Sequence, residues 1–388
     1  MGRKLVTIRQ ITDLRPVANT PAFEIAVVDG WTCAVRTGVF TKGELVVFFE
    51  IDSFLPAPAD DPRYQPQHNP LHTGVITWQG AKGIHVRSIM VNKSHEISQG
   101  VVLKLYAFPE IESIYLDYST VLGPETGLQN MADICFAEKL GVKKWQVATA
   151  EATTSLGRPP VFFPKTEIER VQNIKTLFTK SKYASAVFQE SVKMDGSAMT
   201  VYYVRKESQF YKSLPRLPPG ARADMANGRV GVSSRNHDLS ECAAGGQSSS
   251  SQFWAMALHY RLPRQLERLG RNVAVQGELV GSSVASNRHG YAAGRHDFYV
   301  YGIFDVDAQR YLHPAEAAVR AAQLGLRHVP VLGYVRIRDV AGSCEELLRR
   351  AEGVGMNGRR REGLVYKNVE DGRWFKVGAN DYLLTHGE

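Results

Sequence analysis

The chain has 388 residues, which is too long for one compact core and suggests two domains or three small ones. Its composition, 44% hydrophobic and 22% charged, is typical of globular proteins and excludes a mostly disordered chain. No apolar run approaches the roughly 20 residues of a membrane-spanning helix. The four cysteines have no CxxC spacing, so neither a zinc site nor a disulfide framework is expected. We expect a soluble, intracellular monomer with no membrane partner, in either the cytoplasm or the nucleus.

The net charge of +8 is unevenly distributed along the chain. Residues 1–140 contain 12 basic and 15 acidic side chains, a net charge of −3, which leaves +11 for the remainder. Basic surfaces of this size bind polyanions, because lysine and arginine neutralise phosphates and release counterions. Charge alone is equally consistent with a basic surface that only faces solvent.

Short strands dominate the N-terminal part of the chain. Strand-like runs occupy residues 5–11, 24–30, 32–38, 44–55, 85–91 and 100–106. Turn residues separate them and no helical period is evident, which predicts a small β-barrel of the OB type. The Pro-rich and polar stretch 57–72 is expected to be a surface loop. We assign residues 1–125 to an OB-fold-like domain and residues 126–159 to a connecting segment.

The pattern changes to mixed helices and strands in residues 160–388. Thr166 and Glu169 have the spacing of a capping box, which predicts a helix over 166–180. Further helices are predicted at 253–270 (interrupted by Pro263), 314–325 and 344–353, with a flexible loop at 243–252. Strands are predicted at 186–192, 197–205, 272–281, 297–307, 362–368 and 373–378. The fold class is therefore α+β.

The tetrapeptide KMDG, residues 193–196, carries the central chemical hypothesis. A lysine attacks as a nucleophile only when its amine is neutral, which requires cationic neighbours, a metal or burial. Alone, the pattern is a weak signal and is more typical of an ordinary hairpin turn between two strands. Further segments follow it in order: SSRN (233–236), GELVG (277–281), DFYVYGIFDV (297–306), EGLVYK (362–367) and WFKV (374–377). Together they supply basic groups for phosphates, carboxylates for ribose or a metal, and aromatic faces for a purine.

This ordered set resembles the motifs of the covalent nucleotidyltransferases, which comprise ATP-dependent DNA and RNA ligases and mRNA capping enzymes. SRN, GELVG and EGLVYK are similar to the RNA-ligase versions. Twelve residues follow Lys376, too few for the C-terminal OB domain of DNA ligases and capping enzymes. With the N-terminal barrel and the segments VDGW (28–31), FEIDSFLP (49–56), SQGVVLKL (98–105) and FPKTEIERVQN (163–173), the chain resembles the Deinococcus and Naegleria type of nick-sealing RNA ligase. Residues 160–388 would then be the nucleotidyltransferase domain, of antiparallel sheets with flanking helices.

The resemblance implies a catalytic role for Lys193, which would attack ATP and carry AMP covalently. Asp195 would orient Lys193 or a metal-bound water. Arg235 and Glu278 would contact the ribose, and Glu278 and Glu362 would bind Mg²⁺ or Mn²⁺. Lys367 and Lys376 would hold the AMP phosphate.

Other assignments follow from the same resemblance. Phe304 would stack on the adenine, because it precedes Asp305, and Gln189 and Glu190 would read the adenine edge. Lys165 and Arg170 are candidates for phosphate contacts. Two positions depart from the family pattern: Trp374 replaces the first lysine of K-x-K, and Ala198 replaces an Arg or Asn. For His237, His289, His296 and the basic run 359–361, purely structural roles remain open.

The implied function is an ATP-dependent RNA ligase that joins 3′-OH and 5′-phosphate ends, at nicks in duplexes with ribose on the 3′-OH side. Two alternatives stay open at this point. One is an mRNA guanylyltransferase-like enzyme, and the other is a non-catalytic RNA-binding protein with a ligase-like domain.

Overall fold

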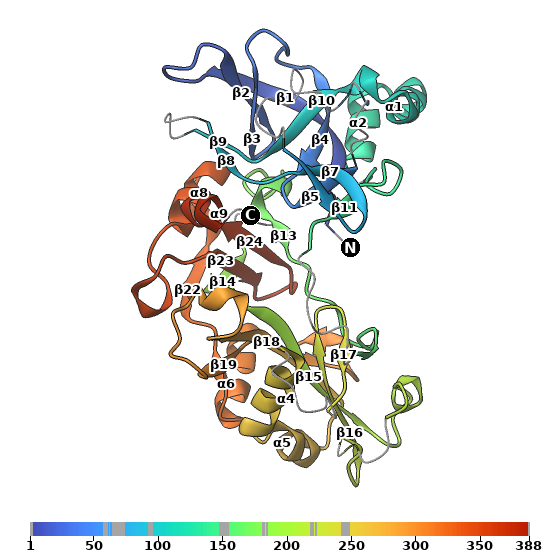
Figure 1. The fold of residues 1–388 in the computed structure, drawn as a ribbon, viewed down its shortest axis with the longest axis vertical. Coiled ribbons are helices and arrows are strands. Elements are labelled where there is room, and N and C mark those ends of the chain that lie inside the picture. Colours follow the sequence, from blue (N-terminus) through green and yellow to red (C-terminus); the bar gives the residue numbers. More distant parts are fainter. Residues whose placement is uncertain are drawn as a thin grey trace.

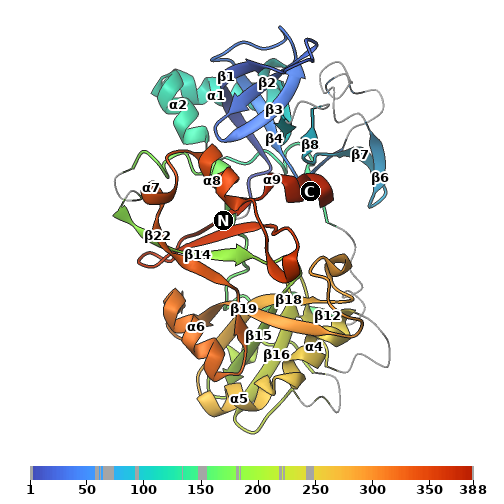
Figure 2. The ribbon, with the colours of Figure 1, turned by 90° about the vertical axis from the view of Figure 1, so that its left-hand side faces the viewer.

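The computed structural model describes residues 3–56, 61, 63, 74–91, 96–132, 134–146, 155–180, 183, 185–217, 221, 223–241 and 249–386. The chain forms an N-terminal lobe and a C-terminal lobe, which lie one above the other in Figures 1 and 2. Within the described ranges, no helix is both long and apolar enough to cross a membrane.

Among the described residues, the N-terminal lobe contains a five-stranded sheet, a four-stranded sheet and a two-stranded pair. Its strands are β1 (Val6–Pro16), β2 (Phe23–Val28), β3 (Trp31–Arg36), β4 (Leu45–Glu50), β5 (Ser53–Pro56), β6 (Val75–Trp78), β7 (Ala81–His85), β8 (Ile89–Met90), β9 (Ile97–Ser98), β10 (Gly100–Lys104) and β11 (Lys143–Lys144). One sheet has the order β10-β4-β1-β2-β3 and the other β11-β5-β7-β6, while β8 pairs with β9. The long strand β1 belongs to two pairings, with β4 through Val6–Gln10 and with β2 through Ile11–Pro16. This shared strand curls the sheet into the expected OB-type barrel.

Two predicted strands of the barrel are each divided in the structure. The run 44–55 becomes β4 and β5, because the chain turns at Asp52, whose φ is +66°. The run 85–91 is shared between β7 and β8, since Val86 exchanges backbone hydrogen bonds with Asp52 and Ser53 between them. The predicted loop 57–72 lies, apart from residues 61 and 63, outside the described residues.

Helices α1 (Pro109–Leu122) and α2 (Pro124–Met131) pack on this barrel, after a short 3-10 turn, η2 (Leu105–Ala107). Ile111 and Met131 are completely buried in the same core as Trp31 and Phe49. That core also includes Val142, just before β11 joins β5. The segment after residue 125 therefore contributes packing to the barrel.

The C-terminal lobe has two sheets with helices on their faces. The strands are β12 (Ser155–Gly157), β13 (Glu169–Arg170), β14 (Val187–Lys193), β15 (Ser197–Arg205), β16 (Gly228–Ser234), β17 (Asp238–Leu239), β18 (Val273–Gly281), β19 (His296–Asp305), β20 (Arg310–Tyr311), β21 (Arg327–His328), β22 (Val331–Arg336), β23 (Gly363–Asn368) and β24 (Trp374–Gly378). One sheet runs β12-β17-β16-β15-β18-β19-β20 with β21 beside β19, and the second runs β13-β24-β23-β14-β22. Figure 1 shows the second sheet nearer the barrel.

The helices of this lobe cover the two sheets. They are α4 (Ser249–His259), α5 (Leu262–Leu269), α6 (Pro314–Gln323), α7 (Ile337–Val340), α8 (Cys344–Ala351) and α9 (Asn380–His386), with 3-10 turns η4 (Val171–Asn173), η5 (Tyr211–Ser213), η6 (Ala285–Asn287) and η7 (Met356–Gly358). α4, α5 and α6 share a core with the larger sheet, and α8 and α9 share one with the smaller sheet. The predicted helix 253–270 is two helices, separated at Arg261, whose φ is +53°. Residues 249–252 of the predicted loop 243–252 belong to α4, and residues 243–248 lie outside the described residues.

The predicted helix 166–180 is wrong. Residues 169–170 instead form β13, parallel to β24, and η4 follows. Thr166 caps no helix, because its hydroxyl bonds the Tyr301 hydroxyl at 2.7 Å. The segment is held by partners far away in the sequence, which override the local capping pattern.

Asn173, in this same segment, joins the two lobes. Its Oδ1 accepts a hydrogen bond from Trp31 Nε1 at 2.8 Å. Its Nδ2 donates to Glu50 Oε2 at 3.0 Å and to Glu169 Oε1 at 2.7 Å. A single amide thus satisfies a buried indole and a buried carboxylate of the barrel, which fixes the barrel against the C-terminal lobe.

Candidate active site

Lys193 lies where the chain crosses from one sheet to the other. β14 ends at Lys193 and pairs with β22 and β23, whereas β15 begins at Ser197 and pairs with β16 and β18. The tetrapeptide KMDG therefore connects two sheets and is not a hairpin turn. At Gly196 a Cβ atom would lie 2.3 Å from the Leu279 carbonyl oxygen, so only glycine fits this crossing.

A pocket opens at this crossing, between the sheets and beneath the barrel. Its walls bring together residues from both lobes: Arg3, Lys144, Thr166, Glu167, Ile168, Ser191, Val192, Lys193, Met194, Ala198, Arg235, Glu278, Tyr301, Val329, Val365, Lys367, Trp374 and Lys376. An adjoining cavity shares Lys193 and Glu278 and adds Asp195 and Glu362. Lys193 thus lines both the main pocket and an adjoining cavity that has more carboxylates.

Carboxylates surround the lysine amine. Lys193 Nζ forms an ion pair with Glu362, which is only 8% exposed. Removal from water raises the pKa of Glu278 to about 8; Lys193 and Arg235 oppose the rise, while Glu362 and Asp195 add to it. The cluster holds several carboxylates close together and is therefore suited to an additional cation.

Asp195 is held by two donors from distant segments. Arg288 Nη1 donates to its Oδ2 at 2.6 Å, and the Tyr382 hydroxyl donates to the same oxygen. Neither contact involves Lys193. Asp195, two residues after Lys193, is therefore positioned by Arg288 and Tyr382.

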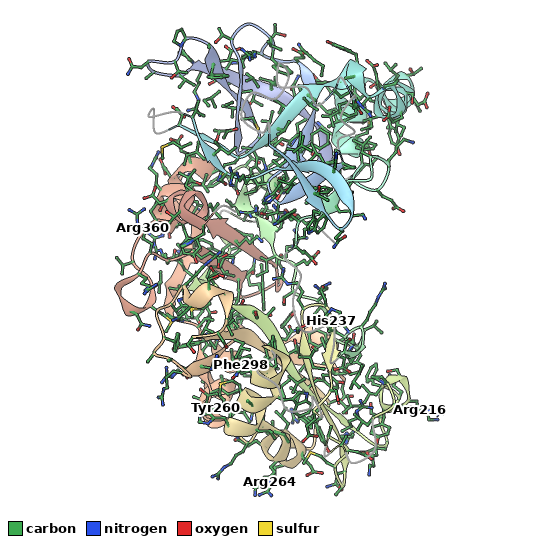
Figure 3. All side chains as sticks on the ribbon, viewed as in Figure 1. Arg216, His237, Tyr260, Arg264, Phe298 and Arg360 are labelled. Carbon is green, nitrogen blue, oxygen red and sulfur yellow. The ribbon has the colours of Figure 1, made fainter. Side chains whose placement is uncertain are left out.

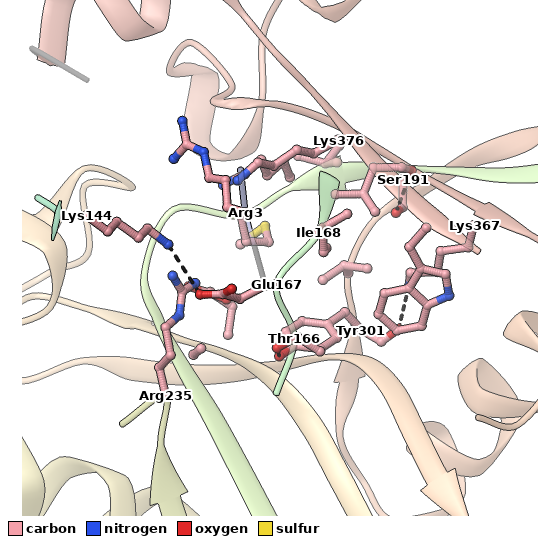
Figure 4. Close-up of a pocket in the computed structure, with 18 residues that line it drawn as sticks. Arg3, Lys144, Thr166, Glu167, Ile168, Ser191, Arg235, Tyr301, Lys367 and Lys376 are labelled. Carbon is pink, nitrogen blue, oxygen red and sulfur yellow. Dashed lines mark hydrogen bonds and ion pairs between the residues drawn. The ribbon is translucent and has the colours of Figure 1, made fainter. Parts of the chain in front are cut away.

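The end of the pocket that contains Tyr301, Val365 and Trp374 is aromatic and apolar. Figure 4 shows Tyr301 and Lys367 on this side, away from Arg3 and Lys144. The Lys367 amine donates to the Tyr301 carbonyl and lies 4.7 Å from the centre of the Trp374 ring. Burial lowers the pKa of Lys367 to about 7. Trp374, where the family pattern has lysine, thus covers a buried lysine with its aromatic face.

Basic side chains converge on the other end. Arg3, Lys144, Arg235 and Lys376 line the pocket there. Burial, together with Arg235 and Arg3, lowers the pKa of Lys144 to about 8, although Glu167 lies 3.6 Å from its amine. Burial, with Arg170 and Arg3 adding, holds the pKa of Lys376 well below its usual range. These cations lie close together although burial and their mutual repulsion lower the pKa values of the two lysines. This end of the pocket is therefore suited to binding a polyphosphate.

Arg3 and Arg170 are anchored by the barrel. Burial alone would raise the pKa of Asp52, but Arg3 and Arg170 outweigh it and hold the pKa well below its usual range. Arg170 Nη2 lies 3.2 Å from Asp52, and Arg3 Nε lies 2.5 Å from Glu50. Arg170, a predicted phosphate contact, lines the adjoining cavity but is engaged by Asp52 and Glu50.

Three predicted contacts of the adenine lie away from the pocket. Phe304 is buried in a core with Phe162 and Tyr202. Glu190 accepts hydrogen bonds from Arg350 at 2.8 and 3.1 Å and from the Tyr366 hydroxyl at 2.9 Å. Gln189 is completely buried and donates to the Tyr334 hydroxyl at 3.0 Å. The aromatic side chains that do line the pocket are Tyr301 and Trp374.

The remaining predicted residues have mixed placements. Lys165 lines a neighbouring cavity and donates to Asn236 Oδ1 at 2.8 Å. Ala198 lines both that cavity and the main pocket. His237, labelled in Figure 3, contacts the Ser155 hydroxyl at 3.1 Å, and His296 contacts the Ser283 hydroxyl at 2.7 Å. Burial lowers the pKa of His289.

The basic run 359–361 is engaged within the protein. Arg361 donates to the backbone carbonyls of Arg350, Ala351 and Glu352 at the end of α8, and Arg360 pairs with Asp381 of α9. These contacts give the run a structural role.

Glu278 and Glu362 are the carboxylates beside Lys193 that could ligate a divalent metal. Among the described residues, no three His, Cys, Asp or Glu side chains converge to hold a metal by themselves. Mg²⁺ usually takes only one or two carboxylates and completes its shell with waters and substrate phosphates. Glu278, with its raised pKa, and the neighbouring Glu362 fit that mode of binding.

Three pocket residues that the proposal uses were not predicted, Arg3, Lys144 and Tyr301, nor were Arg288 and Tyr382, which hold Asp195 outside the pocket. Tyr301 lies at an irregularity of β19, where the register with β18 shifts between Gln276 and Gly277. Such an irregularity breaks the simple alternation of faces, so the sequence could not show which aromatic side chain of β19 reaches the pocket. Arg3, Lys144, Arg288 and Tyr382 come from outside the motifs, which gave no signal for them.

The fold and site define a class: a nucleotidyltransferase-type domain with a lysine at the sheet crossing, preceded by an OB-type barrel. An RNA ligase family model matches residues 186–378, and an OB-fold domain model matches residues 5–105. The structure of Naegleria gruberi RNA ligase with PPi is similar, with 30% identity, a TM-score of 0.78 and 99% of both chains covered. Among curated protein sequences there is no match.

Variants of the same enzyme give equal agreement. An apo variant shares 31% identity at a TM-score of 0.78, covering 100% of this chain and 99% of the other. A variant with AMP and Mn shares 30% identity at a TM-score of 0.78, with 99% of both chains covered. The chain belongs to the RNA ligase family of the nucleotidyltransferase superfamily. The resemblance and the fold class predicted from the sequence are therefore confirmed.

Proposed function

We propose that this ligase uses ATP to join the 3′-OH and 5′-phosphate ends of RNA at nicks in duplexes, through a lysyl-AMP intermediate on Lys193. The observation that carries the proposal is the position of the Lys193 amine between carboxylates and a pocket with one basic end and one aromatic end. ATP has the matching distribution: a polyphosphate at one end and a purine at the other.

The proposed reaction has three transfers at phosphorus. First, Lys193 Nζ attacks the α-phosphorus of ATP, a nitrogen–phosphorus bond forms, and pyrophosphate leaves. Next, an oxygen of the RNA 5′-phosphate attacks the same phosphorus and frees the lysine. Finally, the 3′-OH attacks the activated 5′-phosphorus and AMP leaves. Lys193 gives up its proton to solvent before the first transfer, when its ion pair with Glu362 is released.

The pocket residues have distinct roles in this proposal. Tyr301 and Val365 line the purine end, and Tyr301 replaces Phe304 as our choice for stacking on adenine. Lys144 contacts the departing pyrophosphate, with Lys376 nearer the α-phosphate, while Arg3 is held by Glu50 and Asp52 at the wall of this end of the pocket. Glu278 and Arg235 contact the ribose. Lys367, being buried at the aromatic end, faces the base more than the phosphate.

Glu278 and Glu362 would hold Mg²⁺ or Mn²⁺. When bound, such an ion stabilises negative charge on the transferring phosphoryl group. Structures of the Naegleria enzyme with ATP and Mn support this choice of nucleotide and ion. We retain the proposed domain bounds, 1–125, 126–159 and 160–388, and a monomer.

The proposal is tested by sealing of a nicked duplex with ATP or with GTP, in the presence of Mg²⁺ or Mn²⁺. We expect joining with ATP and none with GTP. Joining with GTP alone, or a protein adduct with GTP alone, would favour the guanylyltransferase reading instead.

A further inference from the structure

The C-terminal helix α9 lies between the barrel and the catalytic turn. It follows β24 directly, after Gly378 and Ala379. Both ribbon views place it at the junction of the two lobes (Figures 1 and 2). It therefore touches both the N-terminal domain and the strands that carry the site.

One side of α9 packs against the barrel. Leu383 is 2% exposed and packs within the barrel core. Asn380 Oδ1 accepts a hydrogen bond from Gln99 Nε2 at 3.1 Å, and Gln99 is itself buried between β9 and β10. Part of the packing of α9 therefore depends on docking of the barrel, in addition to its contacts with the smaller sheet through Tyr382 and with Arg360 through Asp381.

The other side of α9 contacts residues next to Lys193. The Tyr382 hydroxyl donates to Asp195 Oδ2, and Tyr382 is 3% exposed. The backbone amide of Ala379, immediately before the helix, donates to the Glu362 carbonyl at 2.9 Å. One short helix therefore contacts the carboxylate that follows Lys193 and the backbone of the residue that pairs with Lys193.

We propose that Tyr382 is a positioning residue through which docking of the barrel sets the placement of Asp195, and with it the KMDG turn. This inference rests on the proposed adenylation of Lys193. Asp195 Oδ2 has one other side-chain donor, Arg288, which follows η6, a turn whose Ala285, Ser286 and Asn287 all have positive φ. Without the tyrosine hydroxyl, Arg288 is the side-chain donor to Oδ2 that remains among the described residues, and the link from Asp195 to the barrel through α9 is lost.

The experiment measures adenylation of the full-length protein in a single turnover with radiolabelled ATP. Tyr382→Phe removes the hydroxyl and keeps the ring that packs in the core. We expect the maximal rate to fall about tenfold, as the loss of a hydrogen bond to a charged group implies. The ATP concentration for half-maximal rate should change by less than about twofold, because Tyr382 does not line the nucleotide pocket.

Tyr260→Phe is the matched control. Its hydroxyl also donates to an aspartate, Asp297, at 3.2 Å, and Figure 3 shows Tyr260 in the lower lobe, well away from the barrel. This variant should adenylate at the normal rate. Melting temperatures of both variants show whether folding is affected.

Gln99→Ala tests the connection to the barrel. We expect a smaller loss of adenylation rate than in Tyr382→Phe, and no additional loss when both changes are combined, because both act through α9. A normal maximal rate in Tyr382→Phe, or defects of the two variants that multiply, would overturn the inference. Absence of adduct in the unmodified protein would instead contradict the proposed function.

Discussion

Lys193 and Glu362 form an ion pair at the junction of two sheets, although 168 residues lie between them in the sequence. The register of β14 and β23 produces this contact, since Lys193 is opposite Gly363. A lysine bound to a carboxylate is a resting state, because its amine is protonated. In our account, a divalent cation held by Glu278 and Glu362 would neutralise this carboxylate, weaken its ion pair with Lys193 and so favour the neutral amine.

The choice of stacking residue can be tested by two substitutions in β19. We expect Tyr301→Leu to raise the ATP concentration for half-maximal adenylation roughly tenfold, because an aromatic contact with a base contributes about 1–1.5 kcal/mol. Phe304→Leu should leave that concentration unchanged and lower the free energy of unfolding by about 1 kcal/mol, because it changes only core packing. The reverse pattern would restore Phe304 as the stacking residue.

The basic end of the pocket should be needed for adenylation by ATP but not for joining of ends that already carry AMP. We expect Lys144→Ala to slow adenylation about tenfold, since a charge-assisted contact to pyrophosphate is lost. Sealing of a pre-adenylated nick should be nearly normal, because that substrate lacks the β- and γ-phosphates. Lys143→Ala, at the exposed neighbouring position, is the control. Equal defects of Lys144→Ala in both assays would contradict this role.

The buried lysine at the aromatic end predicts a pH dependence of stability. The pKa of Lys367 is about 7 in the folded protein, below its ordinary value of 10.5. Between these values the unfolded chain binds more protons, so the free energy of unfolding rises with pH from about 7 to 10.5. Below pH 7 the folded protein carries the full cost of the buried charge.

Replacement of this lysine by an apolar side chain should remove that pH dependence. We expect the melting temperature of Lys367→Met, relative to that of the unmodified protein, to be higher at pH 6 than at pH 10. Lys139→Met, at an exposed position, should show no such trend. A difference that does not vary with pH for Lys367→Met would mean that this amine is not buried as a free base.

Strand chemistry at the joint is a separate prediction. We expect ribose to be required on the 3′-OH side of a nick, while the 5′-phosphate strand can be RNA or DNA. A 2′-hydroxyl is both a donor and an acceptor, and a site that bonds it leaves polar groups unpaired when it is absent. The assay is sealing of nicked duplexes that differ only in the terminal sugars. Equal rates with deoxyribose at the 3′-OH end would indicate a general polynucleotide ligase.

The strands that carry the motifs could be predicted from the sequence, because alternating apolar residues between turn signals determine them locally. β15, β18 and β23 lie close to the predicted bounds. The segment 166–180 could not be predicted, since the partners of Thr166 and Asn173 lie in β19 and in the barrel. Its capping pattern is real in the sequence but is outweighed by these long-range contacts.

The site shows the same division between local and long-range information. The motifs brought Lys193, Arg235, Glu278, Lys367 and Lys376 to one pocket, as expected from their order along the chain. The motifs did not reveal the irregularity of β19 at Tyr301, so Phe304 was chosen over Tyr301. Arg3 and Tyr382 enter from opposite ends of the chain, and only the docking of the two lobes places them at the site.

The central claim, covalent AMP on Lys193, is tested most directly by incubating the protein with radiolabelled ATP and Mg²⁺ or Mn²⁺ and mapping the label by mass spectrometry of peptides. We predict one AMP on the peptide that contains Lys193, and no label on Lys193→Ala. Lys165→Ala, which changes a lysine outside the main pocket, should be labelled normally. Normal labelling of Lys193→Ala, or AMP on another residue of the unmodified protein, would contradict the account.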